Sequence, residues 1–249
     1  MSARQRVDLQ PAFVLHSYPY RETSLIVEVF SRDHGRVGLV AKGARRPMSQ
    51  LRGVLMAFQP LLIDWSGGGE MKTLVRAEWQ GGQPLLGGQA LLCAYYANEL
   101  LMRLLAREDA HPRLHRAYGD ALRALAVGES QEVVLRRFEL ALLQELGYGL
   151  PLDTDADGLP VRADACYAYI IERGAIALDR SELDEGADEP AVIAGKTLLD
   201  MAAGDFLDPL TLAQSKALMR RLIQHYLGGQ QLQSRRVFTE LFAFPGDNS

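Results

Sequence analysis

Residues 35–53 read GRVGLVAKGARRPMSQLRG, and this stretch decides how the N-terminal part of the chain is interpreted. Val37 to Ala41 is a short apolar run rich in branched residues, which predicts a β-strand. The run continues into a loop punctuated by Gly43 and Pro47. The stretch contains no acid and five cations: Arg36, Lys42, Arg45, Arg46 and Arg52. A loop of one charge sign on a small β-domain is typical of a surface that binds a polyanion.

The rest of the first 80 residues also has the pattern of β-structure. Apolar runs predict strands at residues 13–15 and 25–30, and alternation predicts another from Met71 to Trp79. The run from Val54 to Trp65 contains Pro60, so it predicts two pieces or a bulged edge strand. Five short strands with basic loops fit a small closed barrel of the OB type, and a small SH3-like barrel fits the pattern nearly as well.

From Gly87 onward the apolar residues recur at helical spacing. We therefore expect an α+β protein, with an OB-fold nucleic-acid-binding domain at residues 1–80 and an α-helical domain at 81–249. The expected helices lie at residues 87–105, 112–125, 130–146, 191–203 and 209–227, the last capped by Asp208, with a short helix from Ser234.

Residues 150–190 interrupt the helical pattern and contain 11 acidic side chains against three basic ones. Two strand-like runs, 167–171 and 175–178, predict a small hairpin inside this acidic insert. Asp153, Asp155 and Asp157 resemble the opening of a calcium loop, but the twelfth position holds Asp164 where a bidentate Glu is wanted. We interpret this segment as a solvated acidic turn.

Composition narrows the class of protein. The chain has 249 residues, a formal net charge of -4 and 48% hydrophobic residues, which is ordinary for a globular protein. No apolar run is long enough for a membrane span, and the N-terminus lacks the apolar core of a signal peptide. Two distant cysteines, Cys93 and Cys166, suit a reducing cytosol. We expect a cytoplasmic protein with no membrane contact.

Catalytic and metal motifs are missing from the sequence. The histidines are scattered, Cys166 has no histidine near it, and paired zinc-ligand spacing does not occur. The run from Gly67 to Glu70 lacks the Lys-Ser/Thr of a phosphate-binding loop. We find no nucleophile constellation, so we expect no enzyme, no metal and no cofactor.

The basic loop has two interpretations, a solvated turn or a set of phosphate contacts, and its lack of acids favours phosphate contacts. Among nearby aromatic residues, we expect Tyr18 and Tyr20 to be exposed and able to stack on bases, and Phe58 to be buried. Arg136 lies among apolar residues of a predicted helix. It is either a surface arginine or the cationic rim of a groove for an acidic peptide, with Lys196 as a further candidate.

Short motifs are spread along essentially the whole chain: FVLH at 13–16, ETSL at 22–25, GRV at 35–37, LVAKGAR at 39–45, LRG at 51–53, PLL at 60–62, GE at 69–70, KTL at 72–74, NELL at 98–101, LRRFELALL at 135–143, LGYG at 146–149, YLGG at 226–229 and SR at 234–235. In combination, these motifs resemble those of the RecO family of recombination mediators.

The resemblance implies an N-terminal OB-fold, a helical body and a small insert that holds four-cysteine zinc in some members. Only Cys166 is present in the insert here, so no zinc is expected. The resemblance further implies binding of single- and double-stranded DNA, strand annealing, and recombinase loading with the RecR protein. It also implies recognition of the acidic C-terminal tail of single-strand-binding protein. By position, Arg36, Lys42 and Arg45 match the family's basic stretch, and Arg136 matches its helical-body arginine.

Two other classes of function stay open from the residues alone. One is an adaptor whose basic loop grips acidic protein tails, with DNA binding incidental. The other is an unrecognised nuclease or other enzyme.

Overall fold

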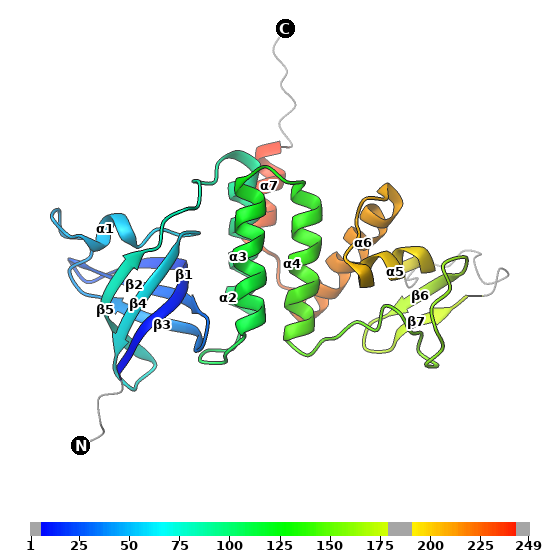
Figure 1. Cartoon of the computed structure of the whole chain (residues 1–249), viewed down its shortest axis with the longest axis horizontal. Coiled ribbons are helices and arrows are strands. Elements are labelled where there is room, and N and C mark those ends of the chain that lie inside the picture. Colours follow the sequence, from blue (N-terminus) through cyan, green and yellow to red (C-terminus); the bar gives the residue numbers. More distant parts are fainter. Residues whose placement is uncertain (1–5, 179–190, 243–249) are drawn as a thin grey trace, which may run out of the picture. The chain divides into compact units, whose positions relative to one another are not determined.

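The structure is a computed structural model that describes residues 6–178 and 191–242. Its contacts divide the chain into two compact units. The first consists of Met1–Gln131 together with Gln231–Ser249, and the second of Glu132–Gln230. Figure 1 shows both units, with colours that follow the sequence and labels on most of the elements.

Five strands of the first unit close into a barrel in the order β1-β2-β3-β5-β4. The β3–β5 pairing is parallel and the other four pairings are antiparallel. This closed five-stranded barrel confirms the predicted OB type. Its elements are β1 (Arg6–Tyr20), β2 (Ser24–Ser31), β3 (Gly35–Ala41), the short helix α1 (Leu51–Val54), β4 (Pro60–Ser66) and β5 (Met71–Trp79).

The run from Val54 to Trp65, expected as β-structure in two pieces or as a bulged edge strand, is a strand only from Pro60 onward. Val54 ends α1, and Pro60 is the first residue of β4, a position where a missing N–H costs no ladder hydrogen bond. Branched and aromatic side chains from all five strands fill the barrel interior, and Trp65 is among the largest of those fully buried.

Two helices of the same unit, α2 (Gly88–Leu104) and α3 (Pro112–Ala126), pack against β1 and β2, and α7 (Gln233–Phe242) packs against α2. Phe13 of β1 and Phe30 of β2 are both buried, and both rings pack against Tyr118 of α3. The Asn98 amide of α2 donates to the Leu15 carbonyl at 2.8 Å and accepts from the Tyr118 hydroxyl. The barrel and these helices therefore share one packed unit.

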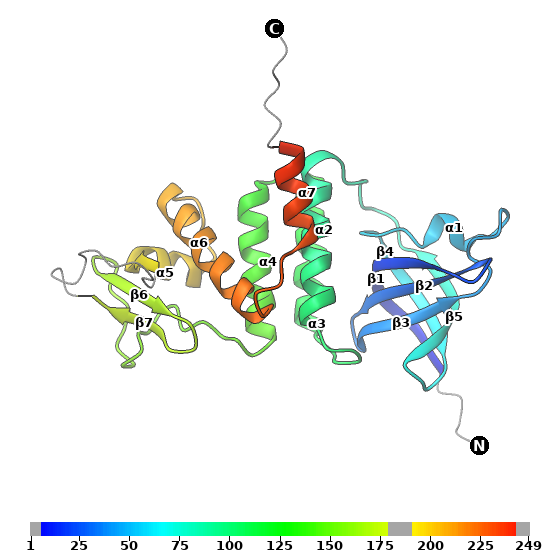
Figure 2. The same ribbon diagram turned by 180° about the vertical axis from the view of Figure 1, so that it is seen from behind.

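The start of α7 is held by a carboxylate from another helix. Glu99 of α2 accepts hydrogen bonds from the backbone N–H groups of Gln233 and Ser234, both at 2.9 Å, and from the Ser234 hydroxyl at 2.7 Å. An acid at a helix N-terminus satisfies otherwise unpaired N–H groups. This contact explains how a helix so distant in sequence lies beside α2 in Figure 2.

The second unit combines three helices with a three-stranded sheet ordered β7-β6-β8. The predicted hairpin of the insert is confirmed as β6 and β7, and residues 179–190 of the insert lie outside the described residues. The elements are α4 (Gln131–Glu145), β6 (Cys166–Ile170), β7 (Gly174–Ala177), β8 (Ala191–Ala194), α5 (Gly195–Ala203) and α6 (Pro209–Tyr226).

Two predicted boundaries are wrong. The strand expected at residues 13–15 is the middle of β1, which spans Arg6–Tyr20. The helix expected from residue 191 begins only at Gly195, because residues 191–194 pair with β6 as strand β8. A Cβ atom on Gly195 would lie 1.9 Å from the carbonyl oxygen of Arg162. The glycine therefore lets the chain turn from strand to helix directly against a neighbouring backbone. The predicted cap of α6 is confirmed, since Asp208 accepts from the Leu210 N–H at 2.8 Å.

Candidate nucleic-acid interface

The basic loop leaves β3 after Ala41 and returns to the barrel as α1. Ala44 is buried, and the Arg45 N–H donates to the Thr23 carbonyl at 2.9 Å. The Arg45 guanidinium also donates to the Arg21 carbonyl at 3.2 Å. These contacts tie the loop to the turn between β1 and β2, so two cation-bearing connections lie side by side.

Four of the five predicted cations of this stretch are exposed: Lys42, Arg45, Arg46 and Arg52. Within residues 6–178 and 191–242, no carboxylate forms an ion pair with any of them. Arg21, which the sequence analysis did not single out, is also exposed and lies over the Tyr20 ring at 5.2 Å. We call these five side chains the cationic end of the barrel.

Arg36, the fifth predicted cation, lies elsewhere. It is half-buried on β3, and its guanidinium donates to the Met102 carbonyl of α2. Burial lowers its pKa, although Glu28 nearby acts in the opposite direction. The Nε atom of Arg36 is buried without a hydrogen-bond partner among the described residues. The structure thus uses Arg36 to join the barrel to α2 and does not bring it together with the other four.

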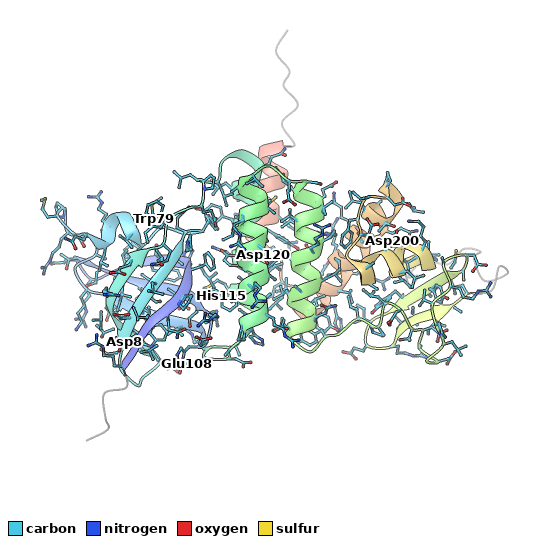
Figure 3. All side chains as sticks on the ribbon, viewed as in Figure 1. Asp8, Trp79, Glu108, His115, Asp120 and Asp200 are labelled. Carbon is cyan, nitrogen blue, oxygen red and sulfur yellow. The ribbon has the colours of Figure 1, made fainter. Side chains whose placement is uncertain are left out.

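The connection between α2 and α3 lies across the outer face of β2 and β3. Arg107 pairs with Glu28 of β2, Glu108 pairs with Lys72 of β5, and the Glu108 N–H donates to the Arg36 carbonyl at 3.0 Å. Figure 3 marks Glu108 in this connection. The face formed by strands 2 and 3 is where OB barrels usually bind oligonucleotides. In this chain that face is covered by the chain itself.

The aromatic residues near the cationic end differ in exposure. Tyr18 is exposed, and its ring lies 4.3 Å from that of His16. Tyr20 is half-buried. Phe58 is buried as expected and packs edge-on against Tyr95 of α2. Tyr18 therefore remains available for stacking, whereas Phe58 belongs to the packing between barrel and helix.

Arg136 of α4 lies inside the second unit. Its side chain is only 8% exposed, pairs with Glu139 at 2.6 Å and reaches the Lys216 carbonyl at 3.4 Å. Its Nε atom is buried and has no hydrogen-bond partner among the described residues. Arg136 is thus an internal arginine that retains one unused donor.

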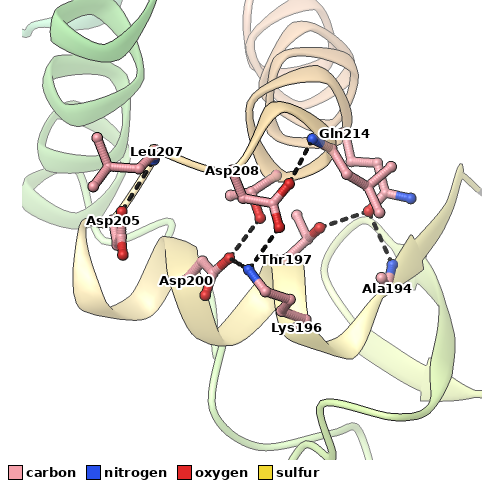
Figure 4. A network of polar contacts seen from close by, with 10 residues as sticks. Ala194, Lys196, Thr197, Asp200, Asp205, Leu207, Asp208 and Gln214 are labelled. Carbon is pink, nitrogen blue, oxygen red and sulfur yellow. Dashed lines mark hydrogen bonds and ion pairs between the residues drawn. The ribbon is translucent and has the colours of Figure 1, made fainter.

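Lys196 of α5 is half-exposed and sits between two carboxylates. It pairs with Asp200 at 2.5 Å and with Asp208 at 2.8 Å, as Figure 4 shows. Hydrogen bonds to Asp200 and then to Asp208 raise the pKa of Lys196, so the ammonium stays charged. Among the described residues, no hydrogen bond or ion pair joins Lys196 to Arg136, so the two side chains do not form one site.

The acidic turn of the insert is closed by its own backbone. The Asp155 carboxylate accepts from the N–H groups of Asp157 at 3.0 Å and Leu159 at 2.8 Å. Across the described residues, no three His, Cys, Asp or Glu side chains are grouped as metal ligands. In the same part of the chain, no helix is both long and apolar enough to cross a membrane.

The fold and the site define the class of protein. This is an OB-barrel protein whose barrel carries a cationic end and packs against helices, followed by a helical body with a small sheet. Residues 7–82 match the family model described as "Recombination protein O N terminal", and residues 87–236 match "Recombination protein O C terminal". The chain belongs to the RecO family.

Curated relatives match the sequence of this chain over nearly their whole length. The chain is 68% identical over 242 residues to the "DNA repair protein RecO" of Azoarcus sp. (strain BH72), covering 97% of this chain and 99% of the relative. It is 67% identical to the protein of the same name from Aromatoleum aromaticum, with the same coverage. Identity to the one from Dechloromonas aromatica is 57%, over 97% of this chain and 99% of that relative.

Proposed function

We propose that this protein is a DNA repair and recombination mediator that binds single- and double-stranded DNA through the cationic end of its barrel. The observation that carries the proposal is the set of exposed cations on the β3–α1 loop, which have no carboxylate partner among the described residues. Paired surface cations are neutralised within the protein, whereas these are free to meet phosphates. The names of the relatives, DNA repair protein RecO, supply the biological setting.

Annealing of complementary strands follows from the same charge. Two DNA strands repel each other, and a cationic surface that neutralises phosphates on one strand lowers that repulsion and releases counterions. The acidity of the chain is concentrated in residues 150–190, away from the barrel in sequence. Such a task needs positioning and charge, and no side chain has to make or break a covalent bond. We propose a non-enzymatic role for this reason.

The proposal includes the partners that membership of the family suggests: the RecR protein, and the acidic tail of single-strand-binding protein on coated DNA. For the tail, we propose Lys196 as the carboxylate-binding donor, with Arg136 contributing positive charge from within the same unit. Lys196 is half-exposed and would exchange its bonds to Asp200 and Asp208 for the tail, whereas Arg136 is only 8% exposed and is paired with Glu139. A bacterial cytoplasmic location near the nucleoid follows from a DNA substrate.

Charge reversal of the loop tests the DNA assignment. Arg45→Glu/Arg46→Glu is expected to weaken oligonucleotide binding, measured by fluorescence anisotropy, and to slow annealing of complementary oligonucleotides, with the folded state intact by circular dichroism. The matched control is Arg162→Glu/Arg173→Glu, which makes the same charge change at two exposed arginines of the insert. Equal affinity of both variants for DNA would remove the loop from the interface.

The same variants separate the mediator from the adaptor. If the loop instead grips acidic protein tails, Arg45→Glu/Arg46→Glu weakens binding of an acidic peptide as strongly as binding of DNA. The mediator proposal expects the peptide to respond to Lys196→Gln and to be unaffected by the loop. Strand cleavage on addition of a divalent metal ion would support the enzyme interpretation.

A further inference from the structure

The chain has two tryptophans, and the barrel places them in opposite environments. Trp65 of β4 lies in the core and is 1% exposed. Trp79 is the last residue of β5 and is 57% exposed. Trp79 therefore presents more than half of a large aromatic side chain to solvent, where its ring is accessible to a ligand.

Strand pairing puts Trp79 at the cationic end of the barrel. β3 and β5 are parallel, with Val40 opposite Thr73, so both strands run toward the same end. β3 passes directly into the basic loop there, and β5 continues to Trp79. The helix α1, which carries Arg52, packs against β5. Figure 3 places Trp79 at the end of the barrel where Figure 1 shows α1.

The indole is held in place although it is exposed. Its N–H donates to the side-chain carbonyl of Gln59 at 3.1 Å, and Gln59 itself is buried. Phe58, which precedes Gln59 in the chain, has a φ of 67°, a left-handed conformation that is costly for a bulky side chain. The Phe58 carbonyl accepts from the buried Gln83 amide at 2.8 Å. The segment that supports Trp79 is therefore fixed, and the ring pays little ordering entropy on binding a ligand.

We propose that Trp79 is a base-stacking residue of the DNA interface, on which one unpaired base of a single strand rests while the cationic end holds its phosphates. The inference rests on the proposed DNA-binding function and adds a residue with a role different from the cations. Cations recognise phosphates of any strand, whereas a stacking ring needs an unpaired base with its face open. Trp79 thus gives the interface a preference for single strands over duplex.

An exposed apolar surface could also serve a protein partner. Val75, which lies four residues before Trp79 on β5, is also exposed. We commit to DNA because the neighbouring connections present unpaired cations to solvent, and a single strand combines phosphates with apolar base faces. The alternative occupant becomes one outcome of the experiment below.

Tryptophan fluorescence tests the proposal in the unaltered protein. An oligothymidylate is titrated in while anisotropy of a dye on the DNA reports binding and tryptophan emission reports stacking. Emission is expected to fall on saturation, because a base lies against Trp79. In Trp79→Phe only the buried Trp65 emits, and its emission is expected to stay constant. Binding by anisotropy without a change in wild-type emission overturns the proposal and leaves the DNA function standing, whereas absence of binding overturns both.

The affinity of variants gives a second, independent measurement. Trp79→Ala is expected to weaken binding of the single strand by about fivefold to a hundredfold, the range for loss of one base–aromatic stack, and to leave duplex binding unchanged. Its salt dependence is expected to match that of the wild type, because no phosphate contact is lost. Equal weakening for single strand and duplex, or emission that responds to RecR and not to DNA, contradicts the proposal. Thermal unfolding of Trp79→Ala is the stability control, because this variant loses the hydrogen bond between residue 79 and Gln59.

Discussion

Glu28 on β2 and Arg107 in the α2–α3 connection form an ion pair on the outside of the barrel, where Glu28 is only 3% exposed. This pair, with Lys72 and Glu108 beside it, fastens the connection over the strand face that OB barrels usually offer to oligonucleotides. Because the connection covers this face, we expect phosphates to be bound by the free cations instead. They lie on the β3–α1 loop and the β1–β2 turn, at the end of the barrel that the connection leaves open.

Packing of the connection against β3 can be tested at Gly35. This glycine has a φ of 63°, and a Cβ atom there would lie 1.8 Å from the carbonyl oxygen of Asp109. Gly35→Ala is therefore expected to lower the free energy of unfolding by about 3 kcal/mol, from backbone strain and overpacking together. Urea denaturation measures this change in the free energy of unfolding. Gly69→Ala is the control, since a Cβ at Gly69 meets nothing within 4 Å; an equally small effect at both sites would contradict the packing.

His115 on α3 is expected to make stability depend on pH. Its ring packs against Phe13 and Phe30, and burial, followed by the charge of Arg32, lowers its pKa to about 4. The unfolded chain binds the proton near pH 6.5. The contribution of the neutral His115 to the free energy of unfolding is therefore present above about pH 6.5. It decreases as the pH falls toward 4, and about 2 kcal/mol is lost by about pH 5.

The measurement is the free energy of unfolding at two pH values in wild type and His115→Phe. The variant keeps a ring in the aromatic cluster but cannot bind a proton. It is expected to lose about 2 kcal/mol less than the wild type between about pH 7 and pH 5. Identical pH dependence of the two proteins would show that His115 does not titrate in this range.

Arg136 is expected to act on stability before it acts on binding. Removing it breaks the ion pair with Glu139, which is not exposed to solvent, and the loss of one partner of a buried pair typically costs 3–5 kcal/mol, so Arg136→Met should cost about 3 kcal/mol. Arg137→Met, at the exposed neighbour that donates to the Gly204 carbonyl, should cost less than about 1 kcal/mol. Similar losses for both would contradict the buried-pair assignment. Peptide-binding assays therefore use Lys196→Gln, whose side chain is half-exposed.

The sequence predicts the local structure of this chain well, because strand alternation, helical spacing and caps are local signals. The five barrel strands, the insert hairpin and the Asp208 cap are all confirmed. The strand at 191–194 was missed because its structure comes from pairing with β6, and isolated apolar residues there also fit a helix. The close approach of Gly195 to Arg162 has no sequence signal of its own.

The candidate site was predictable only in part, for a similar reason. The lack of acids between residues 35 and 53 indicated the loop, but it could not distinguish exposed cations from Arg36, whose strand faces α2. Arg21 joins the loop through a backbone contact with Arg45 that only the folded chain reveals. Trp79 looked like one member of an alternating strand face, and its exposure depends on where β5 ends relative to its neighbours.

The central claim is that free cations at one end of the barrel bind DNA phosphates, and a salt titration of single-strand binding tests it most directly. Each phosphate contact adds about −0.7 to the slope of log affinity against log salt concentration, so the five side chains of the cationic end predict a slope of about −3.5. In Arg45→Gln/Arg46→Gln the slope should become shallower by about 1.4, while Arg162→Gln should leave it unchanged. A slope near zero, or one that the double variant does not alter, would contradict the account.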